Sequence, residues 1–218
     1  MKIIGIDLAG PANHKDTVMT IFEKHQDQLV FESYCENASD SVILSTIREL
    51  ASTHRVIVGM DAPLSYQDGG GDRPQDKEMR NLIKSYGMLG SSIMPPTLTR
   101  MVYLTLRGIA LTRSLRISED FPIEIVEVHP GAAIGTRIDP AYLKDVLMYK
   151  RERTSREVMF HALVEMGLVH LPMELVESSH RIDSCAAALA AWHWVDENKQ
   201  PVWCWNKTCD RHPYECCC

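Results

Sequence analysis

Four acidic residues stand at positions in the chain where carboxylates can act together. Asp7 and Asp61 each end a run of apolar residues, and Glu127 lies near the end of a third run. Asp183 lies in the first turn of a predicted alanine-rich helix. Carboxylate oxygens are the ligands that Mg²⁺ and Mn²⁺ prefer, and a few of them can hold two ions about 4 Å apart. The set predicts two-metal hydrolysis of a phosphodiester, with Asp7, Asp61 and Asp183 as metal ligands and Glu127 as a candidate fourth catalytic residue.

Each of these side chains also has a structural alternative. An aspartate after a strand often begins a turn, and an aspartate in a first helical turn is favourable to the helix dipole. Glu127 could pair with a nearby arginine, and His129, a candidate proton shuttle, could simply be hydrogen-bonded at a strand end. The catalytic prediction therefore rests on the whole set, because ligands of open α/β sheets bind beyond the carboxyl ends of the strands.

A basic helical face is the second feature with chemical potential. Its residues, at intervals of four, three and four, are Arg73, Lys77, Arg80 and Lys84. A cationic face beside an acidic metal site suits a phosphodiester substrate. We predict that Arg73, Lys77 and Arg80 bind substrate; the alternative is a solvated face on which Asp76 and Arg80 pair at i, i+4.

The elements that must position these residues follow from hydrophobic periodicity. Strands are predicted over residues 2–8, 16–23, 28–34, 56–61 and 123–128. Helices are predicted over about 40–50, 74–86, 98–115, 140–149, 154–166 and 179–195. Three adjacent strands followed by alternation with helices indicate an α/β fold with a mixed five-stranded sheet, an antiparallel meander continued by parallel crossovers. Residues 64–122 form a helical insertion between strands four and five in this interpretation.

The composition is that of a globular protein with a sizeable core. The chain has 218 residues, of which 45% are hydrophobic and 24% charged, which is enough to fold without metal or disulfide support. The net charge of -6 disfavours coating of nucleic acid through bulk charge, but it permits a local basic patch. We find no export signal and no apolar run that could cross a membrane, and we expect a cytoplasmic protein without membrane contact.

The chain is expected to divide into one domain, residues 1–200, and a cysteine-rich C-terminal tail, residues 201–218. The tail holds Cys204, Cys209, Cys216, Cys217 and Cys218. We interpret most cysteines as reduced thiols, because a domain of this size needs no disulfides. The spacing of the tail cysteines and His212 matches no common zinc-site pattern.

Several short motifs together resemble a known family. They are Ile4-Gly5-Ile6-Asp7-Leu8-Ala9-Gly10, Gly59-Met60-Asp61-Ala62-Pro63-Leu64, Asp72-Arg73-Pro74 with Asp76 and Arg80, Glu127-Val128-His129-Pro130, and His180-Arg181-Ile182-Asp183-Ser184. Their order over residues 1–195 resembles the family called domain of unknown function 429, which is described as predicted RNase H-like nucleases. The resemblance implies an RNase H-like fold with carboxylates on strand one, strand four and the last helix, the places of Asp7, Asp61 and Asp183.

The leading hypothesis is a metal-dependent nuclease that uses Mg²⁺ or Mn²⁺ and acts on nucleic acid. The acidic total charge also suits an enzyme that binds a small phosphorylated molecule or a nucleotide. A non-catalytic RNase H-like binding module is the third hypothesis, because a fold does not establish a function.

Overall fold

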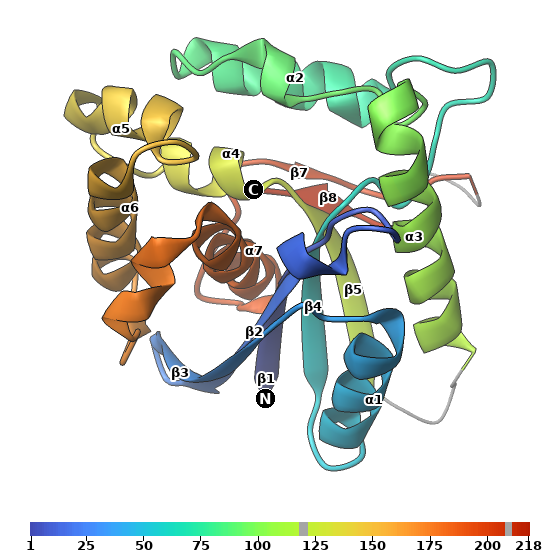
Figure 1. Ribbon diagram of the computed structural model, residues 1–218, viewed down its shortest axis with the longest axis horizontal. Coiled ribbons are helices and arrows are strands. Elements are labelled where there is room, and N and C mark those ends of the chain that lie inside the picture. The colour runs from blue at the N-terminus through green and yellow to red at the C-terminus, as the bar shows by residue number, and fades with distance from the viewer. Residues whose placement is uncertain (118–121, 208–210) are drawn as a thin grey trace.

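The protein is an α/β structure built on one mixed sheet. The computed structural model describes residues 1–117, 122–207 and 211–218, and Cys209 lies outside the described residues. The strands are β1 (Lys2–Asp7), β2 (Val18–His25), β3 (Gln28–Glu36), β4 (Val56–Asp61), β5 (Ile123–Val128), β6 (Leu168–Val169), β7 (Cys204–Trp205) and β8 (Cys216–Cys217). In the described part of the chain they form one eight-stranded sheet in the order β6-β3-β2-β1-β4-β5-β8-β7 (Figure 1).

The centre of the sheet combines antiparallel and parallel pairing, so the expected α/β fold with a mixed sheet is confirmed. β1 and β3 both pair antiparallel with β2, and β4 runs parallel to both β1 and β5. All five predicted strands form; β1 and β4 are continuous buried apolar runs, whereas β2 and β3 carry alternating side chains. The sheet is nevertheless larger than the five strands expected. The short β6 adds to β3, and the C-terminal β8 and β7 extend the sheet beyond β5.

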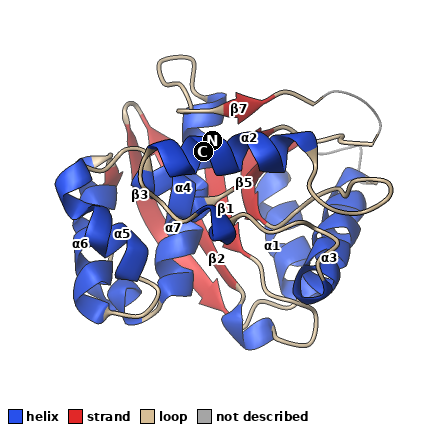
Figure 2. Cartoon of the chain, turned by 90° about the horizontal axis from the view of Figure 1, so that it is seen from above, coloured by secondary structure: helices blue, strands red, loops and turns tan. Residues whose placement is uncertain are grey.

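Helices cover both faces of the sheet (Figure 2). They are α1 (Asp40–Ala51), α2 (Pro74–Ser85), α3 (Thr99–Arg116), α4 (Pro130–Gly135), α5 (Leu143–Met148), α6 (Arg153–Glu165) and α7 (Ser179–Val195). One hydrophobic cluster joins the sheet to α7, α4 and α6, and a second joins it to α1 and α3. None of the helices within the described ranges is both long and apolar enough to span a membrane.

The insertion between β4 and β5 carries α2 and α3. Both views place α2 beyond the carboxyl ends of the central strands, across the edge where the predicted acids stand (Figures 1 and 2). Arg107 of α3 anchors the insertion to the sheet region, because its buried guanidinium donates to the carbonyl oxygens of Ala9 and Ala38 at 2.7 and 2.9 Å. The insertion is therefore a fixed wall over the strand ends.

The close approach of α7 to the sheet depends on two glycines. Gly5 and Gly59 are register partners on β1 and β4. A Cβ atom at Gly5 would lie 1.9 Å from the carbonyl oxygen of Ser184, and one at Gly59 would lie 2.4 Å from that of Ala187. The bare glycine backbone and the small alanines of α7 together let the helix lie directly on the two strands that carry Asp7 and Asp61.

The C-terminal segment is part of the sheet. β8 runs parallel to β5, with Cys216 opposite Glu127, and the backbone N–H of Val202 donates to the carbonyl oxygen of Cys218 at 2.9 Å. Cys217 and Cys218 are fully buried. The residues that we expected to form a separate tail thus complete one edge of the fold.

Candidate functional site

Two of the predicted carboxylates meet at the carboxyl ends of parallel strands. Asp7 of β1 and Asp61 of β4 are direct register partners. Asp7 is buried, with 8% of its surface exposed, and Asp61 is half-buried. The imidazole Nδ1 of His180 lies 2.6 Å from the Asp7 carboxylate and holds it in place. Parallel pairing with no register shift is thus what brings two residues 54 positions apart in the sequence together.

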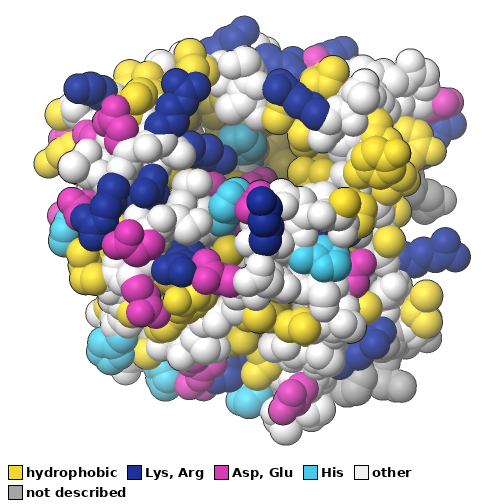
Figure 3. All heavy atoms as spheres, in the orientation of Figure 1, with side chains coloured by type: hydrophobic (Ala, Val, Ile, Leu, Met, Phe, Trp, Pro, Cys, Tyr) yellow, Lys and Arg dark blue, Asp and Glu magenta, His cyan; other side chains and the backbone are white. Residues whose placement is uncertain are grey.

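A cavity of about 210 Å³ opens at these strand ends. Its sheet side is lined by Asp7, Asp61, Glu127, His129 and Lys150. Most of the remaining lining comes from the insertion between β4 and β5, and Leu8, Val128 and Cys216 complete it. Figure 3 shows a hollow below the region of α2 in this orientation, with hydrophobic side chains along one side of it. Three of the four predicted acidic residues, Asp7, Asp61 and Glu127, therefore line an accessible site, whereas Asp183 does not line it.

Asp183 approaches the same place from α7. It is 1% exposed, and its carboxylate accepts a hydrogen bond from the Tyr149 hydroxyl at 2.6 Å and an ion pair from Lys150 Nζ at 3.1 Å. These partners offset the cost of burying the acid. Asp183 is the fifth residue of α7 and not in its first turn, which corrects the sequence-based placement. The helix dipole acts mainly on the terminal turn and so does not account for this residue.

The electrostatics of the site reflect crowded negative charge. Burial raises the pKa of Asp7 above its ordinary value, the hydrogen bond from His180 opposes this, and the Asp183 charge adds to it. Burial and the neighbouring Asp7 charge raise the pKa of Asp61 well above its usual range. The charge of Asp183 raises the pKa of Lys150 in turn. The ammonium group of Lys150 is thus a counter-charge to all three aspartates.

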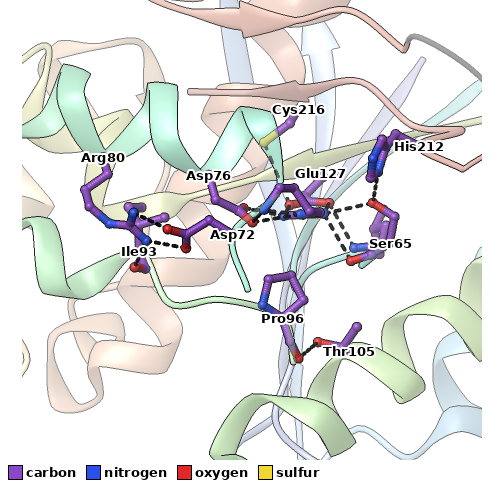
Figure 4. Close-up of polar contacts among 12 residues, drawn as sticks. Ser65, Asp72, Asp76, Arg80, Ile93, Pro96, Thr105, Glu127, His212 and Cys216 are labelled. Atoms are coloured by element: carbon purple, nitrogen blue, oxygen red, sulfur yellow. Dashed lines mark hydrogen bonds and ion pairs between the residues drawn. The ribbon is translucent and has the colours of Figure 1, made fainter. Parts of the chain in front are cut away.

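Glu127 is held in a different way from the aspartates. Arg73 donates to its two carboxylate oxygens at 2.9 and 2.5 Å, and the backbone N–H of Leu64 donates to it at 2.8 Å (Figure 4). The structural alternative of pairing with an arginine is therefore realised. Glu127 lines the cavity, and the positive charge of Arg73 balances its carboxylate. The Glu127–Arg73 pair also fixes the loop that follows β4 through the Leu64 N–H.

Two of the predicted substrate-binding residues, Arg73 and Arg80, are already engaged by acidic side chains in the structure. Arg73 is 2% exposed, and all of its donor groups point to oxygens of Glu127, Asp76 and Ser65. Both terminal nitrogens of Arg80 lie 2.6 Å from the carboxylate of Asp72. The Asp76–Arg80 pair, which the sequence left as the alternative, does not form, because Asp76 binds Arg73 instead and Arg80 binds Asp72.

Lys77 and Lys84 are exposed, whereas Arg73 and Arg80 are already paired with acidic residues. The basic face of α2 is therefore narrower than the sequence indicated. Phosphate binding by Arg73, Lys77 and Arg80 stays a prediction. A guanidinium that already serves two carboxylates, as that of Arg73 does, has a clear structural role.

His129 takes the structural alternative that the sequence left open. Its Nδ1 accepts a hydrogen bond from the backbone N–H of Ala132 at 3.0 Å and so caps α4. Burial lowers the pKa of His129 to about 4, so the ring is neutral near pH 7. A neutral capping histidine fixes the chain that leaves β5 at the edge of the cavity.

Sequence reasoning missed Tyr149, Lys150 and the role of His180. Tyr149 and Lys150 follow α5, and nothing in their local pattern marks them as partners of an acid 34 residues later. His180 belongs to the same motif as Asp183, His180-Arg181-Ile182-Asp183-Ser184. Its position three residues before a predicted site residue could have marked it as part of the site. His212, which lies 2.9 Å from Ser65 Oγ, joins the network around Arg73 from the C-terminal segment.

A divalent cation such as Mg²⁺ needs several oxygen ligands at one place. Across residues 1–117, 122–207 and 211–218, no three His, Cys, Asp or Glu side chains are grouped as a metal site in their present positions. Asp7 and Asp61 supply two adjacent carboxylates of the preferred hard-oxygen type. Asp183 is engaged by Lys150 and Tyr149. The carboxylates of Asp7 and Asp61 fit a divalent cation in donor type and charge.

A family model matches most of the chain. The model of a family described as "Protein of unknown function (DUF429)" matches residues 5–203, a range that includes all four acidic residues. The chain has no match among curated proteins or solved structures.

Proposed function

The chain belongs to the family described as protein of unknown function DUF429. Since this description names no activity, we propose the function from the geometry of the site. We propose a metal-dependent nuclease in which Asp7, Asp61 and Asp183 hold Mg²⁺ or Mn²⁺ for the hydrolysis of a phosphodiester. One observation carries this proposal. The parallel register of β1 and β4 sets Asp7 opposite Asp61 at the mouth of a cavity, at the edge of the sheet where α/β enzymes bind ligands.

An RNase H-like fold is part of the same proposal. The order β3-β2-β1-β4-β5, with β2 antiparallel to its neighbours and β4 parallel to β1 and β5, supports it. The acids stand on strand one, strand four and the last long helix, as in the nucleases that the sequence resembles. The additional strands β6, β7 and β8 lie outside this five-stranded centre.

The residues of the chain divide the work at the site. A divalent cation held by the carboxylates would supply positive charge to the phosphodiester. His180 orients the Asp7 carboxylate, and Tyr149 orients that of Asp183. Lys150 is exposed and lines the cavity, so its ammonium group can turn from Asp183 to a phosphate oxygen. The Glu127–Arg73 pair fixes Leu64 in the wall behind Asp61.

The test combines metal binding with cleavage. We expect Mn²⁺ binding, measured by titration calorimetry, to weaken by at least about 100-fold in Asp7→Asn and Asp61→Asn, because each variant loses a direct ligand. Cleavage of fluorescent DNA and RNA oligonucleotides should fall with it. Asp68→Asn, on an exposed loop, is the matched control and should behave as the wild type. Asn variants that cleave as well as the wild type would overturn the proposal.

A further inference from the structure

The cavity at the strand ends has two walls of opposite chemistry. The sheet side carries Asp7, Asp61 and Lys150. The insertion between β4 and β5 adds an apolar wall made of Met79, Ile93, Met94, Met101 and Leu104, beside the polar residues Arg73, Gln75, Asp76 and Ser92. A site for phosphate alone needs charged and polar groups, so the second wall calls for an apolar part of the ligand.

Two side chains of this apolar wall, Met94 and Met101, lie outside the hydrophobic core. Met94 and Met101 are half-buried, and neither belongs to the two hydrophobic clusters formed by the described residues. Met101 stands in the first turn of α3, and Met94 stands in the loop before it. Methionine is flexible, and its sulfur makes favourable contacts with aromatic rings. Two such side chains, left facing a cavity, provide a surface for a flat ring.

The size of the cavity limits what can enter. Its volume of about 210 Å³ is of the same order as a protein cavity of about 150 Å³ that holds one benzene ring. It admits one base but not a base pair within a duplex. Enzymes that need a base in a pocket act on single strands or turn the nucleotide out of the helix.

We propose that the apolar wall binds a single unpaired nucleobase beside the phosphodiester at Asp7 and Asp61, so that the substrate is single-stranded nucleic acid. This inference rests on the proposed function and specifies its substrate class. The exposed ammonium group of Lys150 lies on the phosphate side of the cavity and completes the complementarity to one nucleotide.

Binding in the absence of cleavage tests the inference. The full-length Asp61→Asn protein, in buffer with EDTA, would be titrated into an oligonucleotide that carries one 2-aminopurine base, either single-stranded or paired with its complement. We expect the emission of the single strand to rise as the base leaves its stack. Binding of the duplex should be weaker by at least about tenfold, because unpairing a base costs a few kcal/mol.

Substitutions in the wall locate the base. Met94→Gln and Met101→Gln keep the side-chain size but remove the apolar contact, and each should weaken single-strand binding by about three- to tenfold. Leu106→Gln is the matched control, because Leu106 lies on α3 with 54% of its surface exposed and does not line the cavity. This control should bind as the parent protein does.

The outcomes separate the two proposals. Absence of single-strand binding, equal binding of duplex and single strand, or unchanged binding in both wall variants would overturn the base site, even if the protein cleaves nucleic acid. Single-strand binding that depends on Met94 and Met101, in a protein that cleaves no nucleic acid with Mn²⁺ present, would support the base site and contradict the proposed nuclease activity.

Discussion

At the scale of single residues, the site holds more negative charge than its immediate surroundings balance. Asp7, Asp61 and Asp183 act on one another, while Lys150 and His180 supply the facing positive or hydrogen-bonding groups. Such an arrangement is costly to the fold and is characteristic of binding sites for cations or of catalytic centres. Glu127 shows the contrast, because its pairing with the buried Arg73 serves the structure.

The cost of the Asp61 charge gives a prediction on stability. Its pKa in the folded protein is raised well above the ordinary 3.8, so folded Asp61 holds its proton to higher pH than the unfolded chain does. The charge therefore costs nothing below pH 3.8, and the cost grows as the pH rises toward the folded pKa. Above that pKa, Asp61→Asn should be more stable than the wild type by about 1 kcal/mol or more.

Thermal unfolding of both proteins between pH 3 and pH 9, in buffer with EDTA, measures this effect. The difference in Tm should be near zero at the acid end and should grow with pH. A difference that is independent of pH, or a variant that is less stable than the wild type at neutral pH, would show that Asp61 is adequately compensated in the fold.

At the scale of elements, the packing of α7 on β1 and β4 decides where Asp183 stands. The helix lies on Gly5 and Gly59 and presents a face of alanines to them. The sequence predicted an alanine-rich helix over residues 179–195, and the helix forms there. The partner of the helix was not evident, since a glycine in a strand does not reveal what approaches it.

Gly59→Ala tests the close approach of α7. The added Cβ would lie 2.4 Å from the Ala187 carbonyl oxygen, so either the helix or the strand must shift. We expect a loss of about 3 kcal/mol in the free energy of unfolding, at the upper end of the range for overpacked cores, and weaker Mn²⁺ binding. Urea denaturation followed by circular dichroism gives the first quantity.

Gly10→Ala is the matched control for this experiment. A Cβ atom at Gly10 meets no atom within 4 Å, so the substitution should change stability very little. Equal stability of the Gly59 and Gly10 variants would mean that α7 has room to move away from the sheet without penalty.

At the scale of the whole molecule, the C-terminal segment closes the fold beside the site. β8 covers the edge of β5, the Cys216 thiol approaches the Glu127 carboxylate, and His212 reaches Ser65. An uncovered edge strand is open to pairing with other chains. The segment therefore protects β5 and supports the network around Arg73.

Truncation after residue 200 is therefore expected to harm the protein. Loss of β8 would expose the edge of β5. It would also remove the fully buried Cys217 and Cys218 and so expose the core residues that they contact. We expect the free energy of unfolding to fall by more than about 2 kcal/mol and the truncated chain to aggregate. Size-exclusion chromatography and thermal unfolding beside the full-length chain measure both effects. A truncated protein of unchanged Tm that stays monomeric would establish the segment as a dispensable tail.

The sequence by itself determined the five central strands and the long helices, and it singled out Asp7, Asp61 and Asp183 as candidate site residues. These features are local, because apolar periodicity and an acid at the end of a run are written in neighbouring residues. Only the tertiary structure decided three further features. They are the contacts of Asp183 with Tyr149 and Lys150, the pairing of Arg73 with Glu127, and the insertion of β8 beside β5. Each joins segments far apart in the chain. Their geometry depends on register and packing, which no local pattern encodes.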